Sequence, residues 1–363
     1  MRRAPSAEDS CFPFAIADTA PDAWGQRVIR RAHVKRREAD PSLPALTAFD
    51  YLAAVDDQSR VGALRLQDER GAFLRSADDH RTPPLLELGQ LYAAIRAVEL
   101  GRESDADLAY LLGKGTSLGG MRPKCTLLEQ DGTLAIGKFP SVTDERSMPR
   151  GEVLALALAR RAGLDVAAAR VVDVDGVPIA VIRRFDRIAS GGRIPYLSAG
   201  SLLQAGRAED RTYTELLDTL RRASAHPGED AHELWRRLVF NLLITNVDDH
   251  LWNLGVLYTS PGRWRLAPAF DLNPFPGRQR ESKTWLSERS GPITTLAQLL
   301  READYFALTR AEAESIVAVA ALAVRDWRRV ATSPEVGLKE SELEAFRHAF
   351  EHAESSAAQA LIG

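Results

Sequence analysis

The chain has 363 residues, 45% hydrophobic and 27% charged, which is typical of a soluble globular protein with a sizeable core. Its net charge of −3 and pI of about 6.2 provide no overall positive field that would attract nucleic acid or an anionic membrane. The two cysteines stand far apart and the apolar runs are short, which argues against a disulfide framework, a cysteine zinc site or a membrane span and favours a reducing cytoplasm.

Residues 1–100 are expected to form a small N-terminal subdomain. Its basic segment Arg30–Arg37 fits a solvated helix face better than a phosphate site. In chain order we predict a helix capped by Asp22, a helix over Thr47–Ala54, a strand over Val61–Leu66, a linker over Arg75–Pro84 and a helix over Leu85–Glu99.

The next segment, about 105–197, has the order of elements found in the small lobe of a kinase. A glycine-rich turn, Gly113–Gly120, precedes a strand, and Asp131-Gly132 is a strong hairpin signal. The predicted elements are strands over Lys124–Glu129 and Thr133–Phe139, a helix over Pro149–Ala162, and strands over Val166–Val174 and Pro178–Phe185.

From Ser198 onward the pattern is almost wholly helical. Two capping boxes, Thr212/Glu215 and Thr309/Glu312, predict helix starts. Further predictions are a helix carrying Leu234–Leu243, a short hairpin over Leu254–Leu266, a helix from Thr309 to about Val330 and a last helix over Glu340–Leu361.

The most informative stretch, Asn246–Asn253, places an Asp five positions before an Asn, and Asp271 follows 18 positions later. Kinases use such a set, in which one carboxylate orients the attacking hydroxyl while an amide and a second carboxylate hold Mg²⁺. The interval matches the D-x-x-x-x-N of the kinase catalytic loop, although the usual His-Arg before the Asp is absent. We therefore identify Asp248 as candidate base and Asn253 and Asp271 as candidate metal ligands. His250 either supplies a polar group to the phosphoryl or orients Asp248.

Three upstream features have the right order for the same chemistry. The glycine turn could bring backbone N–H groups to phosphates, although such a turn alone is more often just flexible. Lys138 ends a strand, where a kinase places the lysine that pairs with phosphates. Glu152 stands in the first turn of the next helix, where it would hold that lysine or simply favour the helix dipole.

An Asp/His metal hydrolase is the rival interpretation of the cluster around Asp248, but it requires more histidine ligands. The pair His348 and His352 is spaced i,i+4 without the Glu of H-E-x-x-H. We interpret it as part of a solvated helix face.

Several motifs together resemble the HipA-like serine/threonine kinases, toxin components of bacterial toxin–antitoxin modules. Ser117–Lys124 is similar to the family's S-x-G-G-x-x-P-K loop, and Asn246–Asn253 to its N-x-D-x-H-x-K-N motif. The other matching segments are Ala269–Pro274, Arg184–Arg187 and Ala20–Gly25. The likeness extends over nearly the whole chain.

This resemblance implies an α+β, bilobal protein-kinase-like fold with a small β-rich N-lobe (about 105–197) and an all-helical C-lobe (about 198–363). The lobes form a kinase domain, 101–363, after the N-terminal subdomain. It implies ATP and Mg²⁺ as cofactors, with Ser117, Gly119, Gly120, Lys138 and Glu152 around ATP. The family pattern further implies Asp248 as base, Asn253 and Asp271 at the metal, and autophosphorylation at Ser117 or its neighbour Thr116, which would expel the loop from the nucleotide site because of its added charge.

The implied partners are a helix-turn-helix, HipB-like antitoxin, DNA reached only through that antitoxin, and a protein substrate such as an aminoacyl-tRNA synthetase. Two departures matter. Trp252 replaces the family's lysine before Asn253, and the N-terminal subdomain is expected to be shortened at its start. These departures keep open a catalytically weak nucleotide-binding partner of an antitoxin complex. A small-molecule or lipid kinase shares all the motifs.

Overall fold

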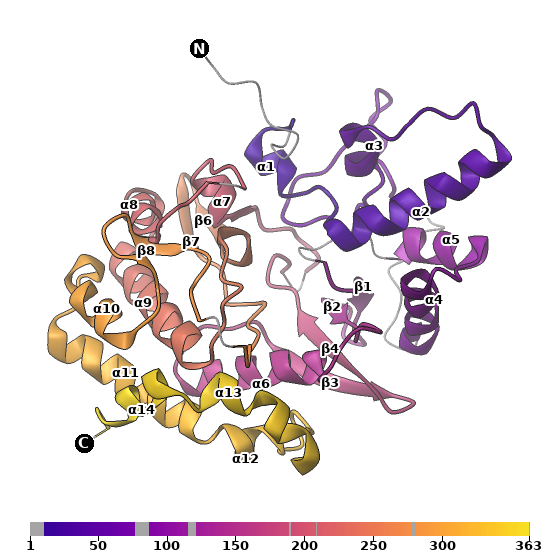
Figure 1. The fold of residues 1–363 in the computed structure, drawn as a ribbon. Helices are drawn as coiled ribbons and strands as arrows, with labels where there is room; N and C mark the ends of the chain where they lie inside the picture. The colour runs from indigo at the N-terminus through magenta and orange to yellow at the C-terminus, as the bar shows by residue number, and fades with distance from the viewer. Residues whose placement is uncertain are drawn as a thin grey trace. The chain divides into compact units, whose positions relative to one another are not determined.

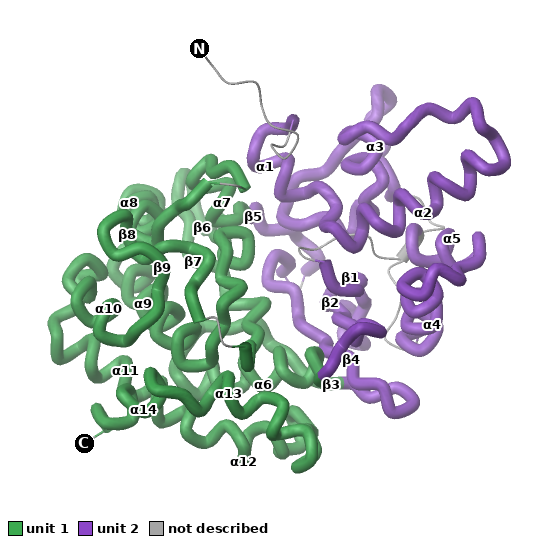
Figure 2. Tube along the Cα trace, viewed as in Figure 1, with its two compact units in different colours: residues 1–9, 146–171, 197–363 green, residues 10–145, 172–196 purple. Residues whose placement is uncertain are grey.

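The computed structural model describes residues 11–76, 87–114, 121–188, 190–207, 209–277 and 280–362. The chain divides into two compact units, which Figure 2 distinguishes by colour. The described part of unit 1 comprises 146–171 and the chain from 197 onward, and that of unit 2 lies within 11–145 and 172–196. Both units mix helices and strands (Figure 1).

Unit 2 is built on an antiparallel sheet with strand order β1-β2-β4-β3. Its strands are β1 (Lys124–Leu128), β2 (Leu134–Lys138), β4 (Val177–Arg183) and β3 (Ala169–Val174), which begins in unit 1. Its helices are α1 (Phe14–Ala17), α2 (Ala23–Ala39), α3 (Ala48–Ala53), α4 (Leu88–Leu100) and α5 (Asp105–Lys114). The Asp22 and Thr47 side chains cap α2 and α3, so these two predicted helix starts are confirmed.

The core of unit 2 lies between the helices and one face of the sheet. Leu91 and Ile95 of α4 are fully buried against Leu127 of β1 and Val181 of β4. The predicted 124–139 hairpin is confirmed, with Cys125 opposite Gly137 and Leu127 opposite Ala135 on this face. Burial alternates with period 2 in β2, whereas in β1 the residues on both faces are buried from Lys124 to Leu127.

The strand predicted over Val61–Leu66 is wrong. Gly62 has a left-handed φ of +68°, and its N–H and C=O are occupied by side chains: the Asp186 carboxylate accepts from the N–H at 2.7 Å and Arg187 donates to the C=O at 3.1 Å. The carbonyl of Arg60 likewise accepts from Arg184. Backbone groups used in this way are unavailable for a strand ladder.

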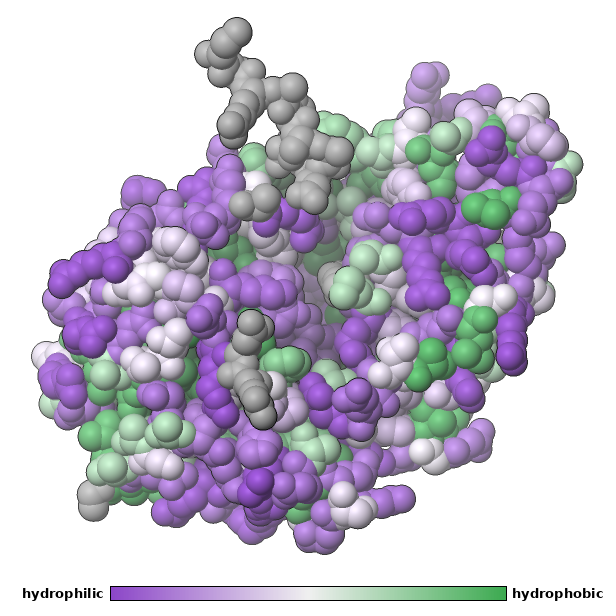
Figure 3. All heavy atoms as spheres, in the orientation of Figure 1, coloured by the Kyte–Doolittle hydropathy of each residue, from purple (hydrophilic) through white to green (hydrophobic). Residues whose placement is uncertain are grey.

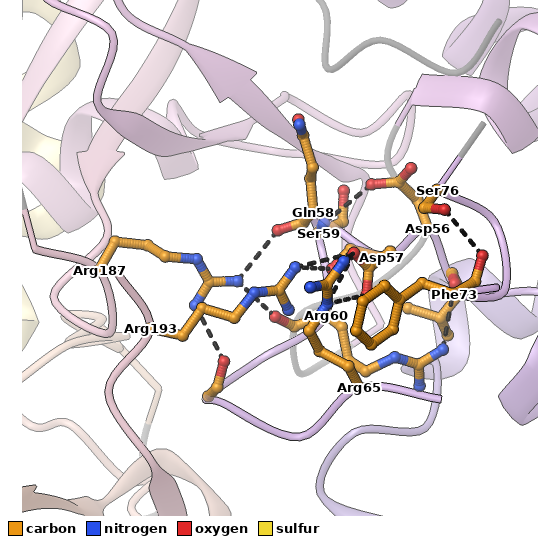
Figure 4. Close-up of polar contacts among 12 residues, drawn as sticks. Asp56, Asp57, Gln58, Ser59, Arg60, Arg65, Phe73, Ser76, Arg187 and Arg193 are labelled. Atoms are coloured by element: carbon orange, nitrogen blue, oxygen red, sulfur yellow. Dashed lines mark hydrogen bonds and ion pairs between the residues drawn. The ribbon is translucent and has the colours of Figure 1, made fainter. Parts of the chain in front are cut away.

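Further contacts of arginine with aspartate and with backbone oxygens hold the same segment of unit 2 (Figure 4). Arg65 and Arg193 both pair with the Asp57 carboxylate, at 2.5 and 3.1 Å. Arg187 donates to the backbone oxygens of Gln58 and Arg60. Burial lowers the pKa of Arg187 to about 10. The segment Arg184–Arg187, which directly follows β4, thus holds residues 56–66 at this end of the sheet.

Unit 1 is mainly helical around the central α9 (Pro227–Leu243), which packs against α8, α10, α11 and α14 (Figure 1). The helices are α6 (Met148–Arg161), α7 (Ala199–Leu202), α8 (Tyr213–Ala223), α10 (Leu296–Arg301), α11 (Arg310–Arg325), α12 (Trp327–Ala331), α13 (Arg347–Phe350) and α14 (Ala353–Gln359), with 3₁₀ turns η2 (Leu251–Asn253), η3 (Ala303–Phe306) and η4 (Glu340–Phe346). Both predicted capping boxes are present, at Thr212 and Thr309.

The expectation of an all-helical C-terminal part is wrong. The three-stranded sheet β5-β6-β7 and the pair β8-β9 lie in this part of the chain. Their strands are β5 (Tyr196–Ser198), β6 (Gly255–Ser260), β7 (Arg263–Leu266), β8 (Trp285–Ser287) and β9 (Gly291–Pro292). The β6–β7 hairpin was itself predicted, and it leads the chain from the Asn253 region to Asp271.

The predicted last helix over Glu340–Leu361 is also wrong, because the chain breaks at Glu351 and His352, which are extended. His352 caps α14, and its ring Nε2 contacts the Leu243 carbonyl oxygen at 3.2 Å. Burial lowers the pKa of His352 to about 4. This ring is therefore a neutral packing group and does not belong to a solvated helix face.

On the face shown in Figure 3, hydrophilic residues predominate and hydrophobic ones form small groups between them. Within the described part of the chain, no helix is both long and apolar enough to cross a membrane.

Candidate active site

The Asn246–Asn253 loop begins at a strained residue directly after α9. Thr245 has φ of +53°, unusual for a β-branched residue, and it is held by contacts from three other segments. Its hydroxyl donates to the Ala349 oxygen at 3.0 Å and accepts from Arg280, and its carbonyl accepts from the Phe275 N–H. Such strain persists only where the surroundings fix it, and it clusters at functional sites.

Asp248 and Asn253 are linked within the loop. The Asn253 amide Nδ2 donates to the backbone oxygen of Asp248 at 2.8 Å, which holds the loop closed across its five-residue interval. The Asp248 carboxylate is 53% exposed, and its Oδ1 lies 2.5 Å from the Lys283 ammonium. The amide oxygen of Asn253 is left for another ligand, because the nitrogen makes the loop contact.

His250 lies 3.8 Å from Asp248, measured from Nε2 to Oδ1. Burial lowers the pKa of His250, and this outweighs the opposing charge of Asp248, so the ring is neutral at pH 7. Its Nδ1 is buried and has no hydrogen-bond partner among the described residues. A buried polar atom without a partner is rare and points to a missing ligand or water.

Asp249, the neighbour of the candidate base, is buried and has a different role. Its carboxylate accepts from the Tyr213 hydroxyl at 2.7 Å and from the Lys283 N–H at 2.6 Å. Burial raises the pKa of Asp249 to about 7 despite these hydrogen bonds. The adjacent aspartates are therefore distinct, with Asp248 open to solvent and Asp249 anchoring the loop from within.

Asp271 also has a left-handed backbone, with φ of +54°. Its Oδ1 accepts from the Asn273 amide at 3.0 Å, and the Asn273 N–H in turn donates to Asn246 Oδ1 at 3.3 Å. Asn246 thereby ties the start of the loop to the segment that carries the second acid. Sequence reasoning used Asn246 only as a motif letter and did not assign this bridge.

His250, Asn253 and Asp271 line one small cavity of about 30 Å³. This volume suits a water molecule or a small ion. An amide oxygen and a carboxylate are hard oxygen donors, which Mg²⁺ accepts while taking its remaining ligands from water and phosphate. In the described residues, no group of three or more His, Cys, Asp or Glu side chains converges as a metal cage. The donor set fits a metal shared with a phosphate ligand.

Trp252, the middle residue of η2, is half-buried and packs against α7 in unit 1. A Cβ on Gly200 of α7 would lie 2.6 Å from the indole ring, so only glycine fits beneath it. The Arg207 guanidinium lies over the indole, 4.6 Å from the ring centroid. The His250 ring meets the indole edge-on, with 6.3 Å between the ring centroids. The position before Asn253 is thus filled by a packed aromatic side chain.

Comparison with known proteins identifies the family. The model of the HipA-like C-terminal domain matches residues 116–328. The chain belongs to this family. The match contains the Asn246–Asn253 loop and Asp271, and thus Asp248 as well as the three candidate residues that line the cavity.

Two curated relatives of this HipA-like chain come from Sinorhizobium fredii (strain NBRC 101917 / NGR234). The protein named "Putative kinase Y4mE" is 29% identical over 243 residues, covering 58% of this chain and 54% of that protein. The protein named "Putative kinase Y4dM" is 30% identical over 150 residues, covering 38% of this chain and 36% of that protein. The chain therefore spans about half or less of the length of these relatives.

Two solved structures share the fold at 16% identity. HipA in the Shewanella oneidensis MR-1 complex of HipA, HipB and operator DNA has a TM-score of 0.67 and covers 96% of this chain and 83% of its own. The Helicobacter pylori proinflammatory kinase CtkA has a TM-score of 0.51 and covers 68% of this chain and 90% of its own. The mixed helix and sheet fold expected from the sequence thus has kinase-like neighbours.

The upstream candidates lie in different parts of the HipA-like chain. Lys138 ends β2 directly opposite Lys124 of β1, so both side chains belong to the same face of the unit 2 sheet. Lys124 is buried and pairs with Asp22 at 3.4 Å. Glu152 is buried in unit 1, but α6 begins at Met148 and has no acidic residue in its first turn, so the first-turn position predicted for Glu152 is wrong. Thr116, Ser117, Gly119 and Gly120 lie outside the described residues.

Proposed function

We propose that the chain is an ATP- and Mg²⁺-dependent protein serine/threonine kinase of the HipA type, with the bilobal kinase architecture expected from its sequence. The observation that carries the proposal is the grouping of His250, Asn253 and Asp271 around one cavity, with Asp248 joined to Asn253. These residue types in this arrangement suit phosphoryl transfer, in which catalysis rests on positioning and charge stabilisation.

Each residue has a role set by its chemistry. Asn253 and Asp271 would hold Mg²⁺, which when bound neutralises charge on the phosphates. Lys138, with Glu152 and the loop residues Ser117, Gly119 and Gly120, would bind ATP. His250 is neutral and offers a polar ring nitrogen to the cavity.

Asp248 receives the acceptor. Its exposed carboxylate accepts the hydrogen bond of a serine or threonine hydroxyl and takes the proton as the reaction proceeds. The hydroxyl oxygen forms a bond to the γ-phosphorus, and the bond from that phosphorus to the β,γ-bridging oxygen breaks. ADP leaves with the electron pair, and Asp248 returns the proton to solvent.

The proposal includes self-modification and partners. Autophosphorylation at Ser117 or Thr116 would add about two negative charges to the glycine loop and prevent it from sharing a site with ATP phosphates. A helix-turn-helix antitoxin like the HipB of the Shewanella complex is the proposed partner, with DNA bound only through it. The proposed substrate is a protein such as an aminoacyl-tRNA synthetase.

Intact-mass measurement after incubation with ATP and Mg²⁺ tests the proposal. We expect a gain of phosphate on Ser117 or Thr116 in the wild type and a rate at least about 100-fold lower in Asp248→Asn and Asp271→Asn. Asp326→Asn is the matched control, since Asp326 is also half-exposed and paired with a cation, Arg329. The control should retain the wild-type rate.

Other outcomes separate the alternatives. ATP binding seen as a thermal shift, without phosphate transfer to protein or small molecules, would favour the nucleotide-binding partner that the packed Trp252 motivates. Transfer to a small molecule or lipid alone would replace the protein substrate. Phosphorylation that survives both aspartate substitutions would overturn the assignment of the site.

A further inference from the structure

Lys283 contacts the candidate base from a segment that no motif identifies. Its ammonium Nζ lies 2.5 Å from Asp248 Oδ1. Of the described residues, it is the only lysine or arginine within ion-pair distance of that carboxylate. The residue lies 35 positions after Asp248, just before β8.

The backbone of Lys283 is fixed to the same loop. Its N–H donates to the buried Asp249 carboxylate at 2.6 Å, and the Thr284 hydroxyl donates to the Asp249 carbonyl oxygen at 2.9 Å. Lys283 therefore contacts two consecutive aspartates, Asp248 through its side chain and Asp249 through its backbone N–H. This double attachment distinguishes Lys283 from a surface lysine that pairs by chance.

The flanking residues fix the segment further. The Ser282 hydroxyl donates to the Thr284 oxygen at 2.6 Å and accepts from the Ile293 N–H at 2.7 Å. The Trp285 N–H donates to the Arg211 oxygen at 3.0 Å. Although the Lys283 side chain is 58% exposed, its Cα is thus held on both sides.

We propose that Lys283 is a positioning residue for Asp248 in phosphoryl transfer, an inference that rests on the proposed kinase function. Its ammonium occupies Oδ1 and leaves Oδ2 to meet the acceptor hydroxyl in one orientation. It also supplies a positive charge beside Asp248, where the neutral His250 and the packed Trp252 supply none. Anionic atoms of the substrate approach Asp248 more easily when its negative charge is paired with the Lys283 ammonium.

The alternative is that Lys283 and Asp248 form an ordinary exposed salt bridge, which contributes little to stability and nothing to turnover. The two explanations differ in kinetics. A residue that orients the base affects kcat and leaves the ATP KM in place, because the base takes no part in nucleotide binding. A misplacement of about 1 Å at such a group costs roughly 100-fold in rate.

The experiment measures steady-state phosphorylation by Lys283→Met and Lys283→Arg at varied ATP concentration. We expect kcat to fall about 10- to 100-fold in Lys283→Met with the ATP KM within about threefold of wild type, and Lys283→Arg to recover most of the rate. Arg310→Met is the matched control: Arg310 is 60% exposed and pairs with Glu314 at 2.5 Å, like Lys283 with Asp248. It should match the wild type.

Thermal unfolding and ATP-induced thermal shift show whether Lys283→Met remains folded and binds nucleotide. If it unfolds at the wild-type temperature and retains kcat within twofold, the inference is wrong while the proposed function stands. If Lys283→Arg is as slow as Lys283→Met, charge pairing is not what Lys283 provides, and the inference is again overturned. A wild type with no phosphoryl transfer would instead overturn the proposed function, and the role of Lys283 with it.

Discussion

Two aspartates paired with cations, Asp186 in unit 2 and Asp248 in unit 1, illustrate opposite uses of a carboxylate. Asp186 is 4% exposed and accepts from Arg184, Arg187 and the Gly62 N–H, at 2.6 to 2.9 Å. Asp248 is 53% exposed, and the ammonium that pairs with it contacts one oxygen. A carboxylate saturated by protein donors maintains structure, while one with an open oxygen can receive a substrate.

The largest stability effect should come from the saturated member of this pair. Asp186→Asn leaves Arg184 and Arg187 buried without their counter-charge, and we expect the free energy of unfolding to fall by about 3–5 kcal/mol. Urea unfolding measures this directly. Asp105→Asn is the control, because Asp105 is 87% exposed and its pair with Lys35 should contribute at most about 1 kcal/mol.

The effect should also depend on pH. Burial opposes ionisation of Asp186, but its arginine partners prevail and lower its pKa. A lowered pKa means that the stabilisation is present above the unfolded value near 3.9 and is lost as the pH falls through the folded value. The difference between wild type and Asp186→Asn should therefore shrink in acid. A difference that is small at pH 7 would show that the network is redundant.

Asp249 should show the opposite pH dependence, although it is also buried. Burial raises its pKa to about 7, so the folded protein binds a proton more tightly than the unfolded chain does. Its contribution is fully present below the unfolded pKa of about 3.9 and is lost as the pH rises towards about 7. Asparagine at this position cannot ionise. The free energy of unfolding of Asp249→Asn should therefore rise relative to that of the wild type by roughly 1.4 kcal/mol per pH unit over this window.

Unfolding measured from pH 4.5 to 8 tests this expectation. Above about pH 7 the difference between the two proteins should become constant, because Asp249 is then ionised in both states. Parallel profiles of wild type and Asp249→Asn would mean that Asp249 stays ionised when buried.

The local features of the fold were predictable because their signals are local. Thr212 with Glu215 and Thr309 with Glu312 form the capping boxes that their spacing indicates. Asp131-Gly132 closes the predicted hairpin. Asp248 and Asn253 are likewise joined by a hydrogen bond inside one loop. In each case the partners lie within a few residues of one another.

The failures and omissions involve partners distant in sequence. Val61–Leu66 is predicted as a strand, but Asp186 and Arg187, more than 120 residues away, take the backbone N–H and C=O of Gly62. Nothing in the order of Asp248 and Asp249 tells which carboxylate is buried, since Tyr213 and Lys283 decide it. Lys283 could not be identified from the sequence for the same reason. It lies in no motif, and it contacts the loop from the segment just before β8.

The smallest effect in this series concerns the packing beside the open carboxylate. Gly200→Ala places a Cβ 2.6 Å from the Trp252 indole, which must move. Overpacking of this kind costs about 1–3 kcal/mol, and the better helix propensity of alanine in α7 returns up to about 1 kcal/mol. We expect a net loss of about 1 kcal/mol in the free energy of unfolding, measured by urea titration.

A double-mutant cycle shows whether Trp252 is the cause. The atoms that crowd the new Cβ are Cε2, Cζ2 and Cδ2 of the indole, at 2.6 to 3.0 Å. Trp252→Ala removes all three and should therefore make Gly200→Ala nearly neutral, and the coupling between the two changes should be about 1 kcal/mol. Additive losses would place the strain elsewhere in α7. A fall in phosphorylation rate with Gly200→Ala alone, restored in the double variant, would show that the packed indole supports the neighbouring Asn253 as well as the fold.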